Sequence, residues 1–482
     1  MSSTLRKERM EKLKRIREKG INPYPSLYFE KQDIKQVLKK KLKQKVRIAG
    51  RIMLFRDMGR ITFMQIRDES ATMQAVINKN EFEGDYKFWI KNLDLGDFVG
   101  ITGERFDTRK KEKSVLVKKI VLLAKAIRPL PDKHKALRNP EQRLRKRYLD
   151  ILFNPEVQDM IYKREKFWQS IRDFMRERGF REVETPILEN VCGGADANPF
   201  VTHHKARDMD LYLRISTGEL WQKRLMVAGL EKTFEIGRQF RNEGMDPEHS
   251  QDYTQMEFYW AYADYKKGME LVRELYREVA LKTFGTLKFK IKDFEVDLGD
   301  EWQTYDYTET VKKMTGINVL EVSPEEIRHK LESLGVEYEK NNFNLSRAVD
   351  NLWKYCRRKI AGPGFLINEP LIVSPLAKKT EDNPKLAERF HVILGGSELG
   401  NGYSELNDPI DQARRFLEQE KLREAGDQEA QMRDDEFVEA LEYGMPPTCG
   451  FGLSERLFSF LMNKTIRECQ IFPLMKPLGS DS

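Results

Sequence analysis

Alternating polar side chains in one short segment have the composition of a binding face for a cation. Asn401, Tyr403 and Glu405 are separated by single residues, and on an extended strand this spacing places all three side chains on one face. Glu257 and Tyr259 have the same spacing in a second predicted strand. An ammonium group has three donors and a positive charge, so a fixed carboxylate beside neutral acceptors suits it. These five residues predict a site for an amine.

Two arginines, Arg241 and Arg456, can bind the anionic groups of a substrate. The planar guanidinium donates five hydrogen bonds in a fork that matches carboxylate and phosphate groups better than lysine does. Such a site can work by positioning reactants and neutralising charge, without a general base. The chain has only six histidines, and its four cysteines lack a C-x-x-C pair and a zinc-binding spacing. These counts argue against histidine-cluster and zinc chemistry.

The elements that position these residues belong to a mixed region in the second part of the chain. Apolar residues three or four apart predict a long amphipathic helix over 157–178, ended by Gly179. Short strands follow among further helices, which indicates an antiparallel sheet with helices around it, an α+β fold. The strand candidates are 211–215, 233–236, 255–262 and 389–394, and the helix candidates include 264–283 and 409–425.

The first part of the chain has a basic helix and then a pattern of short strands. The helix is predicted over 5–19, and the alternating apolar segments indicate a small five-stranded Greek-key barrel of the OB type. The predicted strands are 45–52, 60–66, 73–77, 98–103 and 115–122.

Charge and aromatic residues near this barrel are consistent with nucleic-acid binding. Residues 1–50 contain 16 lysines and arginines against 5 acidic residues, a net +11, whereas the whole chain carries +8. Such an excess is either a solvated face or an electrostatic footprint for nucleic acid. Phe63, Arg51 and Arg67 are the residue types that stack on bases and attract phosphates. Packing inside the barrel is the alternative interpretation of Phe63.

Composition divides the 482 residues into five segments. No apolar run reaches the roughly 18–20 residues of a membrane helix, and the N-terminus lacks the apolar core of a secretory signal. We therefore expect a cytoplasmic protein without membrane association. The segments are a basic helix and lead-in (1–44), the barrel (45–125), a linker (126–152), the larger α+β domain (153–477) and a tail (478–482).

Three segments of the chain resemble the three motifs of class II aminoacyl-tRNA synthetases, and in detail those of the lysyl-tRNA synthetase family. Motif 1 is the helix over 157–178 with the strand that ends at Pro186, and in the family it forms the dimer interface. Motif 2 is the segment 234–244 continued by 255–259, and motif 3 is the segment 450–456. The resemblance extends over nearly the whole chain. It implies that the barrel binds the anticodon of tRNA(Lys).

The resemblance assigns ATP contacts to motifs 2 and 3. It implies that Arg241 bridges the amino-acid carboxylate and the α-phosphate, and that Arg456 holds the γ-phosphate of a bent ATP. Glu243 would read the exocyclic amine of adenine, Tyr253 would stack on the ring, and His249 would lie near the β- and γ-phosphates. Catalysis is then expected from Arg241 and Arg456, with ATP as a substrate and Mg²⁺ as cofactor.

The resemblance also assigns the amine site to L-lysine. Glu405 and Tyr259 would contact the ε-ammonium, Glu219 and the Gly194 backbone the α-amino group, and Asn401 would lie beside the carboxylate. An aspartate-specific relative needs cations in place of Glu405. The predicted lysine site comprises Gly194, Glu219, Arg241, Glu257, Tyr259, Asn401, Tyr403 and Glu405.

Some positions depart from the family pattern. Glu398 matches one of two metal-bridging acidic positions, but His391 occupies the other, and imidazole is a poorer ligand for Mg²⁺. His391 could contact a phosphate directly. Motif 3 is one residue shorter than usual and has Glu455 where aspartate is typical. Residues 300–365 resemble the family least, and we expect helices and a strand there.

These observations predict a homodimeric lysine–tRNA ligase that uses ATP and Mg²⁺ and transfers lysine to the 3′ end of tRNA(Lys). A paralogue that lysylates a protein, such as the elongation factor P modifying ligase, is one alternative, but those relatives lack the barrel. An inactive RNA-binding or regulatory paralogue is another. Loss of Arg241, Arg456 or Glu405 would favour it, and the chain retains all three.

Overall fold

The computed structural model describes residues 2–131, 139–195, 197–244, 246–338, 344–426 and 430–477. The chain forms two compact units, residues 1–138 and 139–482. The division between the units falls inside the predicted linker, 126–152. Residues 132–138 of that linker and the predicted tail lie outside the described residues.

The end of the predicted linker belongs to the second unit. It forms α4 (Pro140–Arg145) and α5 (Arg147–Phe153). Arg147 is buried, and its guanidinium donates to Asp150 at 2.8 Å and to the carbonyl of Gln470 at 3.1 Å. A buried arginine needs such acceptors, and Gln470 lies too far along the chain for a local pattern to reveal the contact.

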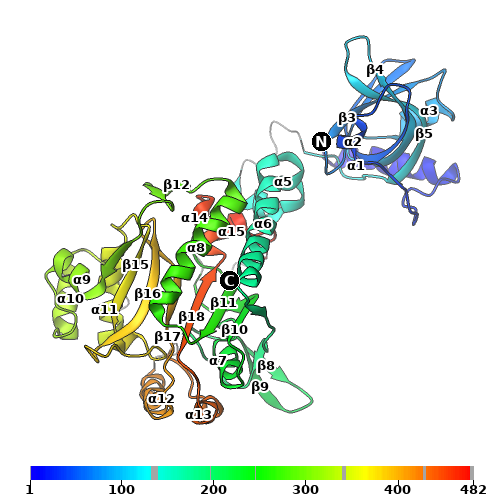
Figure 1. Cartoon of the computed structure of the whole chain (residues 1–482). Helices are drawn as coiled ribbons and strands as arrows, with labels where there is room; N and C mark the ends of the chain where they lie inside the picture. Colours follow the sequence, from blue (N-terminus) through cyan, green and yellow to red (C-terminus); the bar gives the residue numbers. More distant parts are fainter. Residues whose placement is uncertain are drawn as a thin grey trace. The chain divides into compact units, whose positions relative to one another are not determined.

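The first unit is a closed five-stranded barrel, as predicted (Figure 1). Its strands lie in the order β1-β2-β3-β5-β4, which is the connectivity of an OB-type barrel. Alternate side chains such as Val46 and Ile48 fill the interior. The strands are β1 (Lys45–Asp57), β2 (Ile61–Arg67), β3 (Thr72–Asn78), β4 (Phe98–Asp107) and β5 (Lys113–Ala124), and the helices are α1 (Ser2–Glu18), α2 (Ile34–Val37) and α3 (Tyr86–Asn92).

An eight-stranded, mostly antiparallel sheet forms the centre of the second unit, which confirms the α+β prediction. Its order is β14-β15-β16-β17-β18-β11-β10-β6, and only the two edge pairs are parallel. The strands are β6 (Arg181–Glu182), β10 (Lys232–Phe240), β11 (Asp252–Ala261), β14 (Gln303–Asp306), β15 (Gly364–Pro370), β16 (Leu386–Leu394), β17 (Ser397–Ser404) and β18 (Thr448–Ser454).

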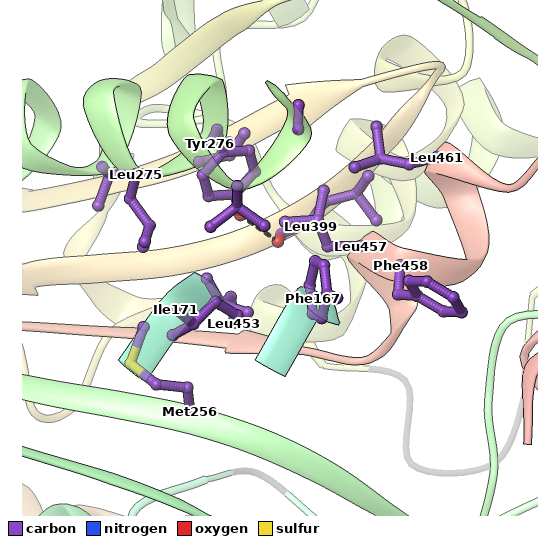
Figure 2. Close-up of a cluster of buried hydrophobic side chains, with 14 of the residues drawn as sticks. Phe167, Ile171, Met256, Leu275, Tyr276, Leu399, Leu453, Leu457, Phe458 and Leu461 are labelled. Carbon is purple, nitrogen blue, oxygen red and sulfur yellow. Dashed lines mark hydrogen bonds between the residues drawn. The ribbon is translucent and has the colours of Figure 1, made fainter. Parts of the chain in front are cut away.

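Two long helices, α6 (Pro155–Glu177) and α8 (Tyr265–Phe284), pack against each other and cover this sheet (Figure 1). Both were predicted within two residues at each end. Figure 2 shows the core beneath them, where Phe167 and Ile171 of α6 meet Met256 of β11 and Leu453 of β18. The buried Tyr276 hydroxyl of α8 donates to the carbonyl of Leu399 at 2.6 Å, which fastens the helix to β17.

Residues 300–365 form a helical insertion with its own small core, as expected. Apolar residues of its three helices pack around Trp353 and Tyr307. The insertion starts at the edge strand β14 and returns through β15, so the central sheet holds both its ends. The helices are α9 (Tyr307–Thr315), α10 (Pro324–Ser333) and α11 (Leu345–Arg357).

Short elements complete the second unit around the sheet. Helix α7 (Glu219–Val227) packs on β10 and β11, and α13 (Asp435–Glu442) packs on α7 and α12. A three-stranded sheet is ordered β7-β9-β8, and β12 and β13 form a hairpin. The remaining bounds are β7 (Leu188–Glu189), β8 (Val201–His204), β9 (Met209–Leu213), β12 (Lys288–Ile291), β13 (Phe294–Asp297), the 3-10 turn Leu371–Val373, α12 (Pro409–Glu424), α14 (Arg456–Leu461) and α15 (Ile466–Cys469).

Candidate active site

An open cavity of about 370 Å³ lies over the middle strands of the central sheet. It brings together all but one of the site residues predicted in the second unit. Glu243 is the exception, because it is half-buried but not part of the lining. The predicted residues that line the cavity are Gly194, Glu219, Arg241, His249, Tyr253, Glu257, Tyr259, His391, Glu398, Asn401, Tyr403, Glu405 and Arg456.

Glu405 gives one end of the cavity a buried negative charge. It follows β17 directly and is only 2% exposed. Its Oε2 lies 2.5 Å from the ammonium of Lys223. Space for this carboxylate depends on Gly450 of β18, where an added Cβ would lie 2.1 Å from Glu405 Oε1. A buried carboxylate needs a nearby cation, so a cationic ligand at this carboxylate would share it with Lys223.

Glu257 and Tyr259 lie next to this carboxylate on β11. The Glu257 carboxylate accepts hydrogen bonds from the Thr217 amide at 2.7 Å, from Gln255 Nε2 at 2.6 Å and from the Tyr259 hydroxyl at 3.1 Å. Because the Tyr259 hydroxyl donates its hydrogen bond to Glu257, the lone pairs of the Tyr259 oxygen remain available as acceptors. The pair therefore adds a neutral acceptor to the acidic end of the cavity.

Lys223 is a buried partner of two predicted site residues, and the sequence prediction did not include it. Its ammonium lies 2.7 Å from Glu219 Oε1 and 2.5 Å from Glu405 Oε2, and its side chain is 1% exposed. The Tyr403 hydroxyl also donates to Glu219. Lys223 follows Glu219 by four residues, a spacing that places both on one helix face. That spacing is a signal for their pairing, but contact with Glu405 depends on tertiary packing.

Burial raises the pKa values of two carboxyl groups in this cluster. For Glu405 burial is the largest cause, Glu219 and Glu257 add to it, Lys223 opposes it, and the pKa rises to about 8. For Glu257, burial and then the charge of Glu219 raise the pKa to about 7 despite its hydrogen bonds. Three carboxylates beside one lysine cannot all ionise easily in the empty cavity.

Arg241 and Arg456 line the other part of the cavity. Arg241 follows β10, its Nε donates to the carbonyl of Ile215 at 3.3 Å, and its guanidinium lies 5.9 Å from the ring centre of Tyr253. Arg456 begins α14, and its Nη2 donates to Glu248 at 2.6 Å. The two guanidiniums make this part of the cavity suitable for anionic groups.

Glu455 of motif 3 connects that motif to the helix of motif 1. Its side chain is fully buried and forms an ion pair with Arg164 of α6. It also accepts hydrogen bonds from Gln470 Nε2 at 2.8 Å and from the Thr254 amide at 3.3 Å. This glutamate has a structural role, because it joins α6, β11 and the start of α14.

The residues near Glu398 fit a limited role in metal binding. Arg357 and Trp353 of α11 donate to the two Glu398 oxygens. Burial alone would raise the pKa of Glu398, but Arg357 and His391 outweigh it and lower the pKa to about 2. His391 Nε2 lies 3.2 Å from Glu369, and the described residues contain no group of three possible metal ligands. This donor set fits Mg²⁺ carried mainly by phosphate oxygens, with Glu398 as the protein carboxylate.

The three predicted nucleic-acid contacts share the outer surface of the barrel. Arg51 and Arg67 are directly opposite each other on β1 and β2, and Phe63 lies on the same face of β2 as Arg67. Arg51 stacks on Phe98 at 4.2 Å. Phe63 is half-buried, alternates with the inward-facing Thr62 and Met64, and is not part of the barrel core.

Comparisons with known proteins agree with both units. A model of class II tRNA synthetases (D, K and N) matches residues 139–476, and a model of the OB-fold nucleic acid binding domain matches residues 46–123. The chain is 42% identical to lysine–tRNA ligases of Thermosipho africanus and Thermotoga maritima, in each case over 99% of this chain and 97% of the relative. The lysine–tRNA ligase of Thermoanaerobacter sp. strain X514 is 42% identical over 97% of this chain and 95% of the length of that relative.

The antiparallel sheet, its three motifs and the cavity define a class II aminoacyl-tRNA synthetase. Within that class, the chain belongs to the lysine–tRNA ligase family. Among the described residues, no helix has the length and apolarity that crossing a membrane requires.

Proposed function

We propose that this chain is a lysine–tRNA ligase, which activates L-lysine with ATP and transfers it to tRNA(Lys). The observation that carries the proposal is the buried Glu405 carboxyl, which shares Lys223 with the Glu219 carboxylate and lines the same cavity as two arginines, Arg241 and Arg456. A cavity with an acidic end and a guanidinium end is complementary to an amino acid that has a second ammonium group. The names of the relatives agree with this activity.

Lysine would lie with its two ammonium groups toward carboxylates. We assign the ε-ammonium to Glu405 and the Tyr259 oxygen, and the α-amino group to Glu219 and the Gly194 backbone. Glu257 holds the Tyr259 hydroxyl, and Tyr403 holds Glu219. Asn401 accepts a hydrogen bond from Arg389 at 2.9 Å, which leaves its amide nitrogen as a donor for the substrate carboxylate.

ATP would occupy the guanidinium end. We assign the α-phosphate and the amino-acid carboxylate to Arg241, and the γ-phosphate to Arg456. His249 would lie near the β- and γ-phosphates. Tyr253 provides a ring for adenine, and Glu243 would have to move to reach the exocyclic amine. Mg²⁺, bound to the phosphates and contacted by Glu398, would supply charge neutralisation. His391 is assigned to Glu369 rather than to the metal.

The first reaction is a displacement at phosphorus. A lysine carboxylate oxygen forms a bond to the α-phosphorus as the bond to pyrophosphate breaks, giving lysyl-adenylate. The nucleophile is already ionised, so Arg241 needs only to align the two anions and stabilise the charge that develops. The tRNA 3′ end then attacks the activated carbonyl and releases AMP.

The direct test is amino-acid-dependent exchange of pyrophosphate into ATP, measured with each common amino acid in the absence of tRNA. Exchange with lysine alone is the expected result. Silence with every amino acid in a folded protein would contradict the proposal and favour an RNA-binding paralogue.

Lysine binding is expected to weaken at low pH. Below the raised pKa values of Glu257 and Glu405, about 7 and about 8, these carboxyls hold protons that an ammonium ligand must displace. Each displaced proton raises the lysine KM by up to about tenfold per pH unit of decrease. The check is the lysine KM at saturating ATP between pH 6 and pH 9, with the ATP KM as control. A lysine KM independent of pH would contradict this assignment.

Phe63→Ala is expected to weaken tRNA charging without changing adenylate formation. Loss of one aromatic stacking partner costs about 1–3 kcal/mol, or about five- to 150-fold in tRNA affinity. The measurements are the tRNA KM in charging and the rate of pyrophosphate exchange. Phe55→Ala is the matched control, because Phe55 packs against the barrel core and its loss should lower the unfolding temperature. An equal fall in exchange for Phe63→Ala would make Phe63 a structural residue.

We also propose that the protein is a cytoplasmic homodimer joined through motif 1. Large apolar side chains support this, since Tyr162 of α6 and Ile187 and Leu188 just after motif 1 are 43–48% exposed. Burial of such residues between two copies is the usual way to cover them. Sedimentation equilibrium measures the mass directly.

A further inference from the structure

A carboxylate of the chain itself lies between two cations near the ATP end of the cavity. Glu248, in the loop between β10 and β11, accepts from Arg456 Nη2 at 2.6 Å, from Lys292 Nζ at 2.7 Å and from the Ser397 hydroxyl at 3.3 Å. Burial alone would raise the pKa of Glu248, but Lys292 and Arg456 outweigh it and lower the pKa to about 2. Glu248 is therefore an anion held by three donors from three separate segments.

The two cations also contact one aromatic ring besides Glu248. Lys292 Nζ lies 4.9 Å and the Arg456 guanidinium 5.7 Å from the ring centre of the same residue, Phe460. Lys292 sits in the turn between β12 and β13, and its amide donates to Asn463 at 3.0 Å. Two neighbouring cations repel each other, so this arrangement is stable only with an anion between them.

The donor set around Glu248 is the one that a phosphate group needs. A guanidinium fork, an ammonium and a hydroxyl can each donate to a different phosphate oxygen. Arg456 also has a buried Nε that lacks a hydrogen-bond partner among the described residues. Glu248 and Arg456 both line the cavity. A terminal phosphate of ATP and the Glu248 carboxylate have the same sign of charge and compete for the same Arg456 donors.

We propose that Glu248 occupies the place of the terminal phosphate of ATP in the nucleotide-free protein, between Arg456 and Lys292, and that Lys292 contacts this phosphate after Glu248 is displaced. The inference rests on the proposed assignment of Arg456 to the γ-phosphate. It makes Lys292 a further ATP-binding residue and Glu248 an internal competitor of ATP. Residues outside motifs 2 and 3 then help to hold the nucleotide.

The test is the ATP dissociation constant of the full chain, measured by calorimetry with Mg²⁺ and without lysine or tRNA. Glu248→Ala and Glu248→Gln are expected to bind ATP about fivefold more tightly or better, because a competing anion is removed. Lys292→Met is expected to bind ATP about fivefold more weakly, because a counter-charge is lost. The glutamine variant keeps the size of the side chain, so it separates charge from shape.

Lys290→Met is the matched control. Lys290 is exposed on β12, two residues from Lys292. Neither lysine lines the cavity, but of the two only Lys292 is ion-paired with Glu248 among the described residues. ATP binding by Lys290→Met should equal that of the unchanged protein. Weaker binding by both Glu248 variants, or an effect of Lys292→Met no larger than that of Lys290→Met, would overturn the inference. Because no lysine is present, these outcomes are distinct from a failure of lysine activation, which pyrophosphate exchange measures.

Discussion

Glu405→Gln is expected to reduce kcat/KM for lysine activation by about 30- to 4,000-fold, because leaving a buried ammonium without its counter-charge costs about 2–5 kcal/mol. Glutamine has nearly the same shape as glutamate, so the loss of kcat/KM measures the contribution of the negative charge. The carboxylate is buried and forms an ion pair with Lys223. The measurement is pyrophosphate exchange as a function of lysine concentration.

The same variant should bind ATP normally, because Glu405 belongs to the acidic end of the cavity and Arg241 and Arg456 to the other. Glu388→Gln is the matched control, since Glu388 lies on the neighbouring strand β16 and does not line the cavity. It should keep both affinities. Equal losses for lysine and ATP in Glu405→Gln would mean that the ammonium site has been placed wrongly.

Arg241→Ala is expected to lower the rate of lysyl-adenylate formation by about 10²- to 10³-fold, the usual effect of removing a fixed donor that stabilises developing charge. Arg241 lines the same cavity as Glu405 and Arg456, and its guanidinium lies 5.9 Å from the ring centre of Tyr253. Arg241→Lys should recover only part of the rate, because an ammonium cannot bridge two anions with a planar fork. Single-turnover formation of the adenylate at saturating substrates measures this step.

Arg238→Ala provides the control for general loss of positive charge on β10. Arg238 is ion-paired with Asp252, its side chain is 41% exposed, and it does not line the cavity. Its replacement should change the rate by less than about threefold, as is usual for an exposed ion pair. An Arg241→Ala variant that changes only the lysine KM would indicate a role in ground-state binding alone.

The pattern of apolar residues was enough to predict much of the fold. Period-two alternation predicted the five barrel strands, and helical spacing predicted α6 and α8, because local burial repeats with the period of the backbone. The division after residue 138 falls inside the predicted linker, but the inclusion of residues 139–152 in the second unit was not predicted. It depends on Arg147, whose acceptor Gln470 comes from the far end of the chain, and local patterns carry no information about such a contact.

Within the candidate site, the sequence by itself determined which residue types are present and which family motifs contain them. Arg241 and Arg456 could be selected from those motifs, and Glu405 from its alternation with Asn401 and Tyr403. Only the tertiary structure decided what surrounds them. Lys223 reaches Glu405 because α7 packs on the sheet, and Glu248 reaches Lys292 across the fold. Charges act through space and through burial rather than along the chain, so these partners become visible only when the chain is folded.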